Sequence, residues 1–194
     1  TSNGGGVAKK ASTTDSTVAS AVVGSSASNA SYSLTVSAVA DSATASFDQT
    51  YSSLSTAVST SGSGTVTILV GTGSDQKTIT ASVTANTTTV EDLVNALNSD
   101  SDVSGRFAAS AVNVGTSASP SYKIVLTSLQ QGESKGSLSI AADPAITELQ
   151  TSTLDQATDA AFTISGISGT ITRSSNSVSD VISGVTFNIA KTGT

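Results

Sequence analysis

Short runs of β-forming residues, separated by turn-forming residues, constrain the fold of this chain more than any other feature. Thr, Val and Ile favour the half-buried surface of a sheet, whereas Ser and Gly favour turns. In residues 32–39 the apolar-leaning residues Tyr32, Leu34 and Val36 alternate with polar ones, as one face of a half-buried strand requires. Strands are predicted over residues 18–23, 32–39, 65–70, 78–83, 107–114, 122–128, 162–167, 169–173 and 185–189. The sequence therefore predicts a mainly β protein with minor α structure.

Two segments have a helical period instead. Four apolar residues in the predicted helix near 89–98 recur at the spacing of one helical face: Val90, Leu93, Val94 and Leu97. Thr88 is the predicted N-cap of this helix, with Glu91 as the acidic partner in a capping box. A single helical turn is predicted within residues 174–184, ending at a glycine. Its apolar side would consist of Val178, Val181 and Ile182.

Two small β-rich domains are predicted, the second inserted in the first. Residues 59–64 have the Ser- and Gly-rich composition of a flexible linker and precede a new run of strands, so a boundary is placed there. The first domain is discontinuous, comprising residues 1–60 plus 156–194, and both ends of the chain are expected to share a sheet. The inserted domain comprises residues 61–155. The first six residues are expected to be a flexible tail.

Charge and residue usage exclude several classes of function. The chain has 8 basic and 14 acidic residues and a net charge of −6, whereas binding to nucleic acid requires a basic surface. It has no cysteine and no histidine, which removes disulfides, thiolate nucleophiles, imidazole bases and the usual zinc ligands. No apolar run reaches the roughly 20 residues of a membrane helix. We therefore expect no cofactor, no metal, no nucleic acid partner and no membrane.

Carboxylate pairs are the remaining candidates for catalysis, because glycosidases use two of them. Three pairs lie close in sequence: Glu91 with Asp92, Asp100 with Asp102, and Asp155 with Asp159. The favourable field at a helix N-terminus explains the first pair. A solvated loop explains the second better than a calcium site does, since the glycine and closing Glu of an EF-hand are missing. Residues 71–77 lack the ending of a phosphate loop and predict a hairpin turn. No catalytic, cofactor-binding or metal-binding residue is predicted.

Exposed aromatic residues would indicate glycan binding. The chain has seven aromatic residues: Phe47, Phe107, Phe162, Phe187, Tyr32, Tyr51 and Tyr122. Five of them lie in predicted strands, where core packing explains them. Phe47 and Tyr51 lie in a less regular segment, where packing under a loop is favoured over a surface role. A β-sandwich adhesin or glycan-binding module, acting at a host or cell surface, is kept as the alternative function.

Several stretches carry motifs of one known family. A polar segment at 9–15 precedes a Tyr-Ser-apolar-x-Val strand at 32–36. Residues 159–187 are more specific, because a strand is followed by an Arg-Ser-x-Asn turn at 173–176 and by Asp-x-Ile-x-Gly-Val-Thr at 180–186. Two further segments are similar to the family's β-rich insert: residues 90–98 and 122–128. Together these motifs resemble the bacterial flagellar hook-associated protein 2 family, the filament cap proteins.

The resemblance implies a structural protein rather than an enzyme. Proteins of that family form a ring-like cap at the tip of the extracellular filament and hold flagellin until it folds and polymerises. The implied partners are other copies of the same chain, flagellin and, in some bacteria, host surface glycans. The family's long helical legs have no counterpart in this sequence, so the chain is expected to be the head alone.

Overall fold

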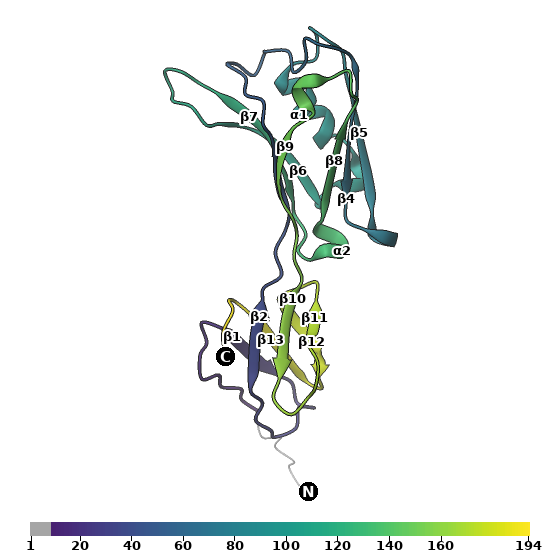
Figure 1. Cartoon of the computed structure of the whole chain (residues 1–194). Helices are drawn as coiled ribbons and strands as arrows, with labels where there is room; N and C mark the ends of the chain where they lie inside the picture. The colour runs from purple at the N-terminus through teal and green to yellow at the C-terminus, as the bar shows by residue number, and fades with distance from the viewer. Residues whose placement is uncertain (1–8) are drawn as a thin grey trace, which may run out of the picture. The chain divides into compact units, whose positions relative to one another are not determined.

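Contacts along the chain separate it into two units. The computed structural model describes residues 9–194, except for the side chain of Asp102, so the predicted tail lies outside the described residues. Unit 1 combines the residues up to Ala40 with Asp159–Thr194, and unit 2 is Asp41–Thr158 (Figure 1). Both units consist mainly of strands, which confirms the predicted fold class.

Unit 1 contains two antiparallel sheets of three strands each. The first has the order β1 (Ala19–Val23), β13 (Val185–Ile189), β12 (Ser177–Ile182). The second has the order β11 (Ile171–Arg173), β10 (Ala160–Ile164), β2 (Leu34–Ala38). Because β1 pairs with β13 and β2 pairs with β10, the expectation that both ends of the chain share a sheet is confirmed.

The core of unit 1 is built on two phenylalanines. Phe162 and Phe187 meet edge to face with ring centroids 5.2 Å apart, an arrangement that aromatic pairs prefer. Smaller apolar side chains pack around them, including Val36, Val178 and Ile189. Val36 is 2% exposed, so the alternation that predicted its strand correctly placed this residue on the buried face.

The helical turn predicted within residues 174–184 is wrong, because Ser177–Ile182 form the strand β12. The apolar residues of this segment are β-branched and favour strands. Val178 lies opposite Phe187 and Ile182 opposite Val185, with a shift of register between these pairs. A bulge breaks the simple alternation of a strand, so that apolar residues spaced by three and four positions fit a bulged strand as well as a helix.

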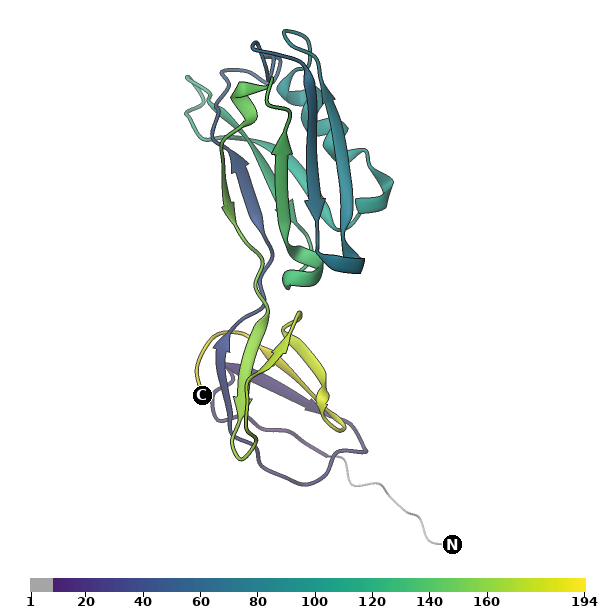
Figure 2. The ribbon, with the colours of Figure 1, turned by 45° about the vertical axis from the view of Figure 1, so that its right-hand side comes forward.

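Unit 2 contains one four-stranded and one three-stranded antiparallel sheet (Figure 2). The first has the order β6 (Phe107–Asn113), β7 (Tyr122–Ser128), β3 (Thr44–Phe47), β9 (Ser152–Asp155). The second has the order β5 (Lys77–Val83), β4 (Gly64–Val70), β8 (Leu138–Ala142). The described helical segments are α1 (Val90–Asn98), α2 (Glu133–Gly136), η1 (Gly73–Asp75), η2 (Ser101–Val103) and η3 (Thr147–Leu149).

The strands of unit 2 with clear alternation were predicted and the others were not. The predicted hairpin is the pair β4 and β5, which stay in register from Gly64 opposite Val83 to Val70 opposite Lys77. Strands β3, β8 and β9 are missing from the prediction. They are four or five residues long and rich in Ser, Ala and Thr, so their local signal is weak. They form because neighbouring strands supply partners for their backbone groups: β7 pairs with β3, β3 with β9, and β4 with β8.

The helix α1 packs against β5 and β6. Three of its apolar residues are fully buried: Val90, Leu93 and Leu97. Its N-cap is Thr89 rather than the predicted Thr88. The Thr89 hydroxyl accepts from the Asp92 N–H at 3.1 Å, and Asp92 accepts from the Thr89 N–H at 3.0 Å. The capping box is therefore present one residue later than predicted, because Asp92 fills the acidic position.

Residues 41–60 pack in unit 2, although the predicted boundary assigned them to the discontinuous domain. Phe47 and Val58 are 0% exposed and belong to the core of unit 2. Ser59, the first residue of the predicted linker, is also 0% exposed. The composition of residues 59–64 indicated a flexible linker, but hydrogen bonds within unit 2 hold this segment. The structure therefore divides the chain after Ala40 and after Thr158.

We expect each unit to fold without the other. Replacing residues 41–158 by a short Gly-Ser linker should leave unit 1 folded, because β2 and β10 already pair at Ala38 opposite Ala161, so the linker closes a hairpin. A single cooperative thermal transition by circular dichroism, with dispersed amide resonances, checks this. A second protein, consisting of residues 41–158 alone, is measured in the same way for unit 2. An unfolded ensemble for both fragments would show that the two units are one cooperative domain.

Candidate functional site

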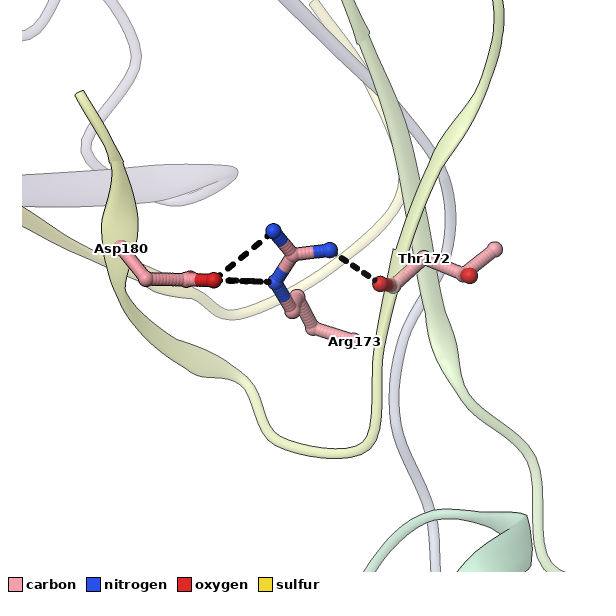
Figure 3. Close-up of polar contacts among 3 residues, drawn as sticks. All are labelled: Thr172, Arg173 and Asp180. Atoms are coloured by element: carbon pink, nitrogen blue, oxygen red, sulfur yellow. Dashed lines mark hydrogen bonds and ion pairs between the residues drawn. The ribbon is translucent and has the colours of Figure 1, made fainter.

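The Arg-Ser-x-Asn turn of the sequence motif joins β11 to β12 in unit 1. Arg173 and Asp180 form a two-pronged ion pair across this turn (Figure 3), with the Arg173 Nε 2.9 Å from Oδ2 and Nη2 2.8 Å from Oδ2. Arg173 Nη1 also donates to the Thr172 carbonyl at 2.7 Å. Hydrogen bonds from Arg173 hold the pKa of Asp180 below its ordinary value. Both side chains are exposed, so the pair orients the connection between β11 and β12 and adds little to the stability of unit 1.

Asn176, in the same turn, holds the end of the first chain segment of unit 1. Its Oδ1 accepts from the Ala40 N–H at 2.8 Å, and its Nδ2 donates to the Ala40 carbonyl at 2.8 Å. Ala40 is 2% exposed, so its backbone groups have little access to water. Asn176 therefore forms the two hydrogen bonds that a neighbouring strand would otherwise form with Ala40.

The glycine of the second motif is also explained by structure. Gly184 has φ 73° in the turn between β12 and β13, a conformation that residues with a side chain rarely adopt. A Cβ atom there would lie 2.6 Å from the Ala27 nitrogen. The motif residues Arg173, Asn176, Asp180 and Gly184 thus shape unit 1 and do not converge on a reactive centre.

Glu148 is the most strongly hydrogen-bonded carboxylate described. Its Oε1 accepts from the Thr60 N–H at 2.7 Å, from the Thr60 hydroxyl at 2.9 Å and from the Ser61 N–H at 3.1 Å. The Ser61 hydroxyl donates to Oε2. Partial burial raises the pKa of Glu148, but the bonds from Ser61 and Thr60 outweigh it and hold that pKa far below its ordinary value. Glu148 therefore anchors the loop that was predicted to be a flexible linker.

Tyr51 lies beside this loop. Its hydroxyl donates to the Val58 carbonyl at 3.0 Å, and the residue is 5% exposed. Burial raises the pKa of Tyr51, and the charge of Glu148 adds to the effect. A hollow of about 460 Å³ is lined by Tyr51, by polar side chains, and by Ala57 and Pro120. Glu148 is its one charged lining residue and is already engaged, so the hollow offers no acid–base pair.

The carboxylates considered from sequence have different places in the structure. Asp92 caps α1, and the Thr89 backbone and side chain lower its pKa. The side chain of Asp102 lies outside the described residues. Asp155 lies in β9, in unit 2, whereas Asp159 lies in unit 1. Within the described part of the chain, no group of three His, Cys, Asp or Glu residues is placed to hold a metal ion. Residues 71–77 form the predicted hairpin turn, with η1 inside it.

Aromatic residues are mostly inside. Five are buried: Phe47, Tyr51, Phe107, Phe162 and Phe187. Phe47 and Tyr51 therefore pack in the core, as was favoured over a surface role, although Phe47 lies in the strand β3 rather than under a loop. Tyr32 differs from its prediction: it precedes β2 and is 51% exposed. The exposed aliphatic residues include Val112 and Val114 near the end of the β6–β7 hairpin. No described helix has the length and apolar character needed to cross a membrane.

We expect Asn176→Ala to destabilise unit 1 by about 1–3 kcal/mol, because it leaves the N–H and C=O of Ala40 without partners. Chemical denaturation followed by circular dichroism measures this change. Asn188→Ala is the matched control, since Asn188 is an exposed asparagine of β13. Equal stabilities of the two variants would contradict the role given to Asn176.

We expect Glu148→Gln to lower the free energy of unfolding at pH 7 by about 1–3 kcal/mol, since hydrogen bonds to a charged acceptor are lost. The folded pKa lies below the unfolded value of about 4.5, so the contribution of this carboxylate is present above that pH and is lost as pH falls further. The difference between the two proteins should therefore narrow below about pH 4.5. Glu91→Gln serves as control, and a gap independent of pH would contradict the assignment.

Comparison with known proteins agrees with these motifs. Residues 157–194 match the family model described as flagellar hook-associated protein 2 C-terminus. This segment contains β10, β11, β12 and β13, and therefore four of the six strands of unit 1. No curated protein matches the sequence of the chain.

Solved flagellar cap proteins share the fold. The FliD D2-D3 domains from Escherichia coli have 23% identity and a TM-score of 0.71, covering 92% of this chain and 91% of that one. Those from Serratia marcescens have 22% identity and a TM-score of 0.68, covering 91% and 95%. FliD (HAP2) from Pseudomonas aeruginosa has 19% identity and a TM-score of 0.63, covering 91% and 80%.

The chain spans 51% of the longer Escherichia coli structure that contains the D1-D2-D3 domains. At these identities the structural likeness shows the fold, and the family model adds a likeness in sequence over residues 157–194. The resemblance to the bacterial flagellar hook-associated protein 2 family that the sequence motifs indicated is therefore confirmed, by the family model in the carboxyl-terminal segment and by the D2-D3 fold over most of the chain.

Proposed function

We propose that this chain is the head of a flagellar filament cap that assembles with other copies of itself at the filament tip, outside the cell, and promotes the folding and polymerisation of flagellin. One observation carries the proposal: the segment that matches the family model supplies the strands on which unit 1 is built. The likeness of the whole fold to flagellar cap proteins supports it further.

The proposed role is mechanical rather than enzymatic. The groups whose pKa values are displaced include Asp92, Glu148 and Asp180, and each accepts hydrogen bonds that fix a helix end, a loop or the connection between two strands. Displaced pKa values often mark active sites, but structural networks displace them as well. In this chain the structural explanation accounts for each of these groups. We therefore assign the function to surfaces and not to a reactive centre.

Adhesion to glycans receives less support. Glycan recognition usually relies on exposed aromatic rings, and Tyr32 is the exposed aromatic residue in the described part of the chain. A lone ring does not make a stacking platform. Host surface glycans therefore remain a hypothesis that follows from the family resemblance alone.

A motility experiment tests the proposed function. In a cap-deficient bacterium, we expect the full-length protein that carries this chain to restore filament growth and swimming. The same protein with residues 41–158 replaced by a short linker should be exported without restoring filaments of normal length, because unit 2 would take part in handling flagellin. Electron microscopy of filaments measures both outcomes.

Export is measured in parallel by immunoblot of the culture medium. An exported full-length protein that restores no filament growth would contradict the cap function. Equal rescue by both proteins would contradict the role of unit 2 in handling flagellin. Unit 2 would then be a surface domain that filament assembly does not require.

A further inference from the structure

Strand edges are where one polypeptide adds to the sheet of another, because their outward N–H and C=O groups are available. In this chain three amide side chains occupy such groups in the same manner. Each bonds both the N–H and the C=O of one backbone residue, at distances between 2.8 and 2.9 Å. The pairs are Asn98 with Ala109 of β6, Gln156 with Leu138 of β8, and Asn176 with Ala40 after β2.

Other edges carry other forms of protection. The edge of β2 is also covered by Gly193, whose C=O accepts from the Val36 N–H at 2.7 Å and whose N–H donates back at 3.0 Å. The edge strand β5 begins with Lys77, a charge of the kind that discourages strand addition. Protection of edges is therefore a recurring property of this fold.

The strand β9 is different. It pairs with β3 on one side, and all four of its residues are exposed. The Asp48 N–H donates to the Thr151 C=O at 3.0 Å, which fixes the alternation of this ladder. By that alternation, the N–H and C=O groups of Ser152 and Leu154 point away from β3. No side chain of the described part of the chain caps these groups.

The side chains of β9 define what could be added beside it. On one face Leu154 lies opposite the buried Ala45 and is 40% exposed, so the apolar face of the sheet continues to the edge. On the other face the Thr153 hydroxyl donates to Asp48 at 3.1 Å, and Asp155 follows. Among the described residues, neither Asp48 nor Asp155 forms a salt bridge.

We infer that the free edge of β9 binds an extended segment of another polypeptide in which apolar residues alternate with basic ones. The apolar residues would extend the face at Leu154, and the basic residues would meet Asp48 and Asp155. A second copy of this chain is a poorer occupant. Two β9 strands paired around Thr153 would bring both Asp48 carboxylates together, and like charges across strands are destabilising.

This inference deepens the proposed function and rests on it for the biological source of the segment, which would be a polypeptide being assembled at the cap. The chemistry of the edge does not depend on that source. Binding to one short strand is expected to be weak, with a Kd on the order of 0.1–1 mM. Several copies in a ring would raise the effective affinity.

Hydrogen exchange on the isotope-labelled chain tests the inference directly. The probe is the blocked peptide Thr-Lys-Val-Lys-Val-Thr, at a concentration about ten times its Kd, where exchange at protected amides should slow about tenfold. We expect this protection at the amides of Ser152 and Leu154, which point outward. The peptide with Glu in place of Lys should bind at least several-fold more weakly. Protection confined to other residues, or equal binding of both peptides, overturns the inference.

Two substitutions separate the backbone and side-chain contributions. Leu154→Pro removes an outward N–H and spares the bonds to β3, a position where an edge strand tolerates proline, and should weaken the peptide about three- to tenfold. Leu154→Lys removes the apolar contact and adds a like charge, and should weaken it about tenfold or more. Val112→Lys is the matched control, because Val112 is 41% exposed in β6 and Leu154 is 40% exposed. Equal losses in Leu154→Lys and Val112→Lys would contradict the location.

Failure of this inference can be told apart from failure of the proposed function. Suppose that the full-length protein restores filaments but the Ser152 and Leu154 amides gain no protection from the peptide. This result would overturn only the role of the β9 edge. In the opposite case, the basic peptide binds at the β9 edge but the full-length protein does not restore filaments. This result would support binding at the edge and overturn the cap function.

Discussion

Antiparallel pairing between segments far apart in the sequence is the constraint on which both units depend. In unit 1, Val36 of β2 lies opposite Phe162 of β10, and in unit 2 Ala45 of β3 lies opposite Leu154 of β9. The chain has no cysteine, so no disulfide fixes this arrangement. Register is set instead by the buried faces of the paired strands, because a slip of one residue would turn every apolar side chain outward.

Polar side chains complete the strands where the backbone lacks a partner. Asn98, Gln156 and Asn176 each satisfy an N–H and a C=O of one residue, and Glu148 collects the donors of a loop. Backbone groups with little access to water must be paired, and an amide side chain offers the same donor and acceptor as a peptide group. The same contacts displace the pKa of Glu148, so a signal that often marks catalysis here reports loop architecture.

The likeness to the family lies in residues that shape the backbone of unit 1 rather than in reactive groups. Three motif residues shape unit 1: Arg173 orients the connection between β11 and β12, Asn176 holds Ala40, and Gly184 allows the turn between β12 and β13. All three lie within residues 157–194, the segment that matches the family model. Function in such a protein is expressed through exposed surfaces, and among these the edge of β9 differs from the protected edges around it.

The sequence by itself determined the β class, the hairpin of β4 and β5, the helix α1 and the motif segment, because alternation, helical period and capping are local properties. It could not determine β3, β8 and β9, whose Ser, Ala and Thr residues have weak preferences until a neighbouring strand pairs with them. It also placed Ser59 in a flexible linker and Val178 in a helical turn, whereas Glu148 and β13 hold them in ordered structure. Glu148 is distant in sequence from Ser59, and the strand β13 that pairs with Val178 gives no signal at Val178 itself, so only the tertiary structure decided the boundary between the units and the edge of β9 that remains free.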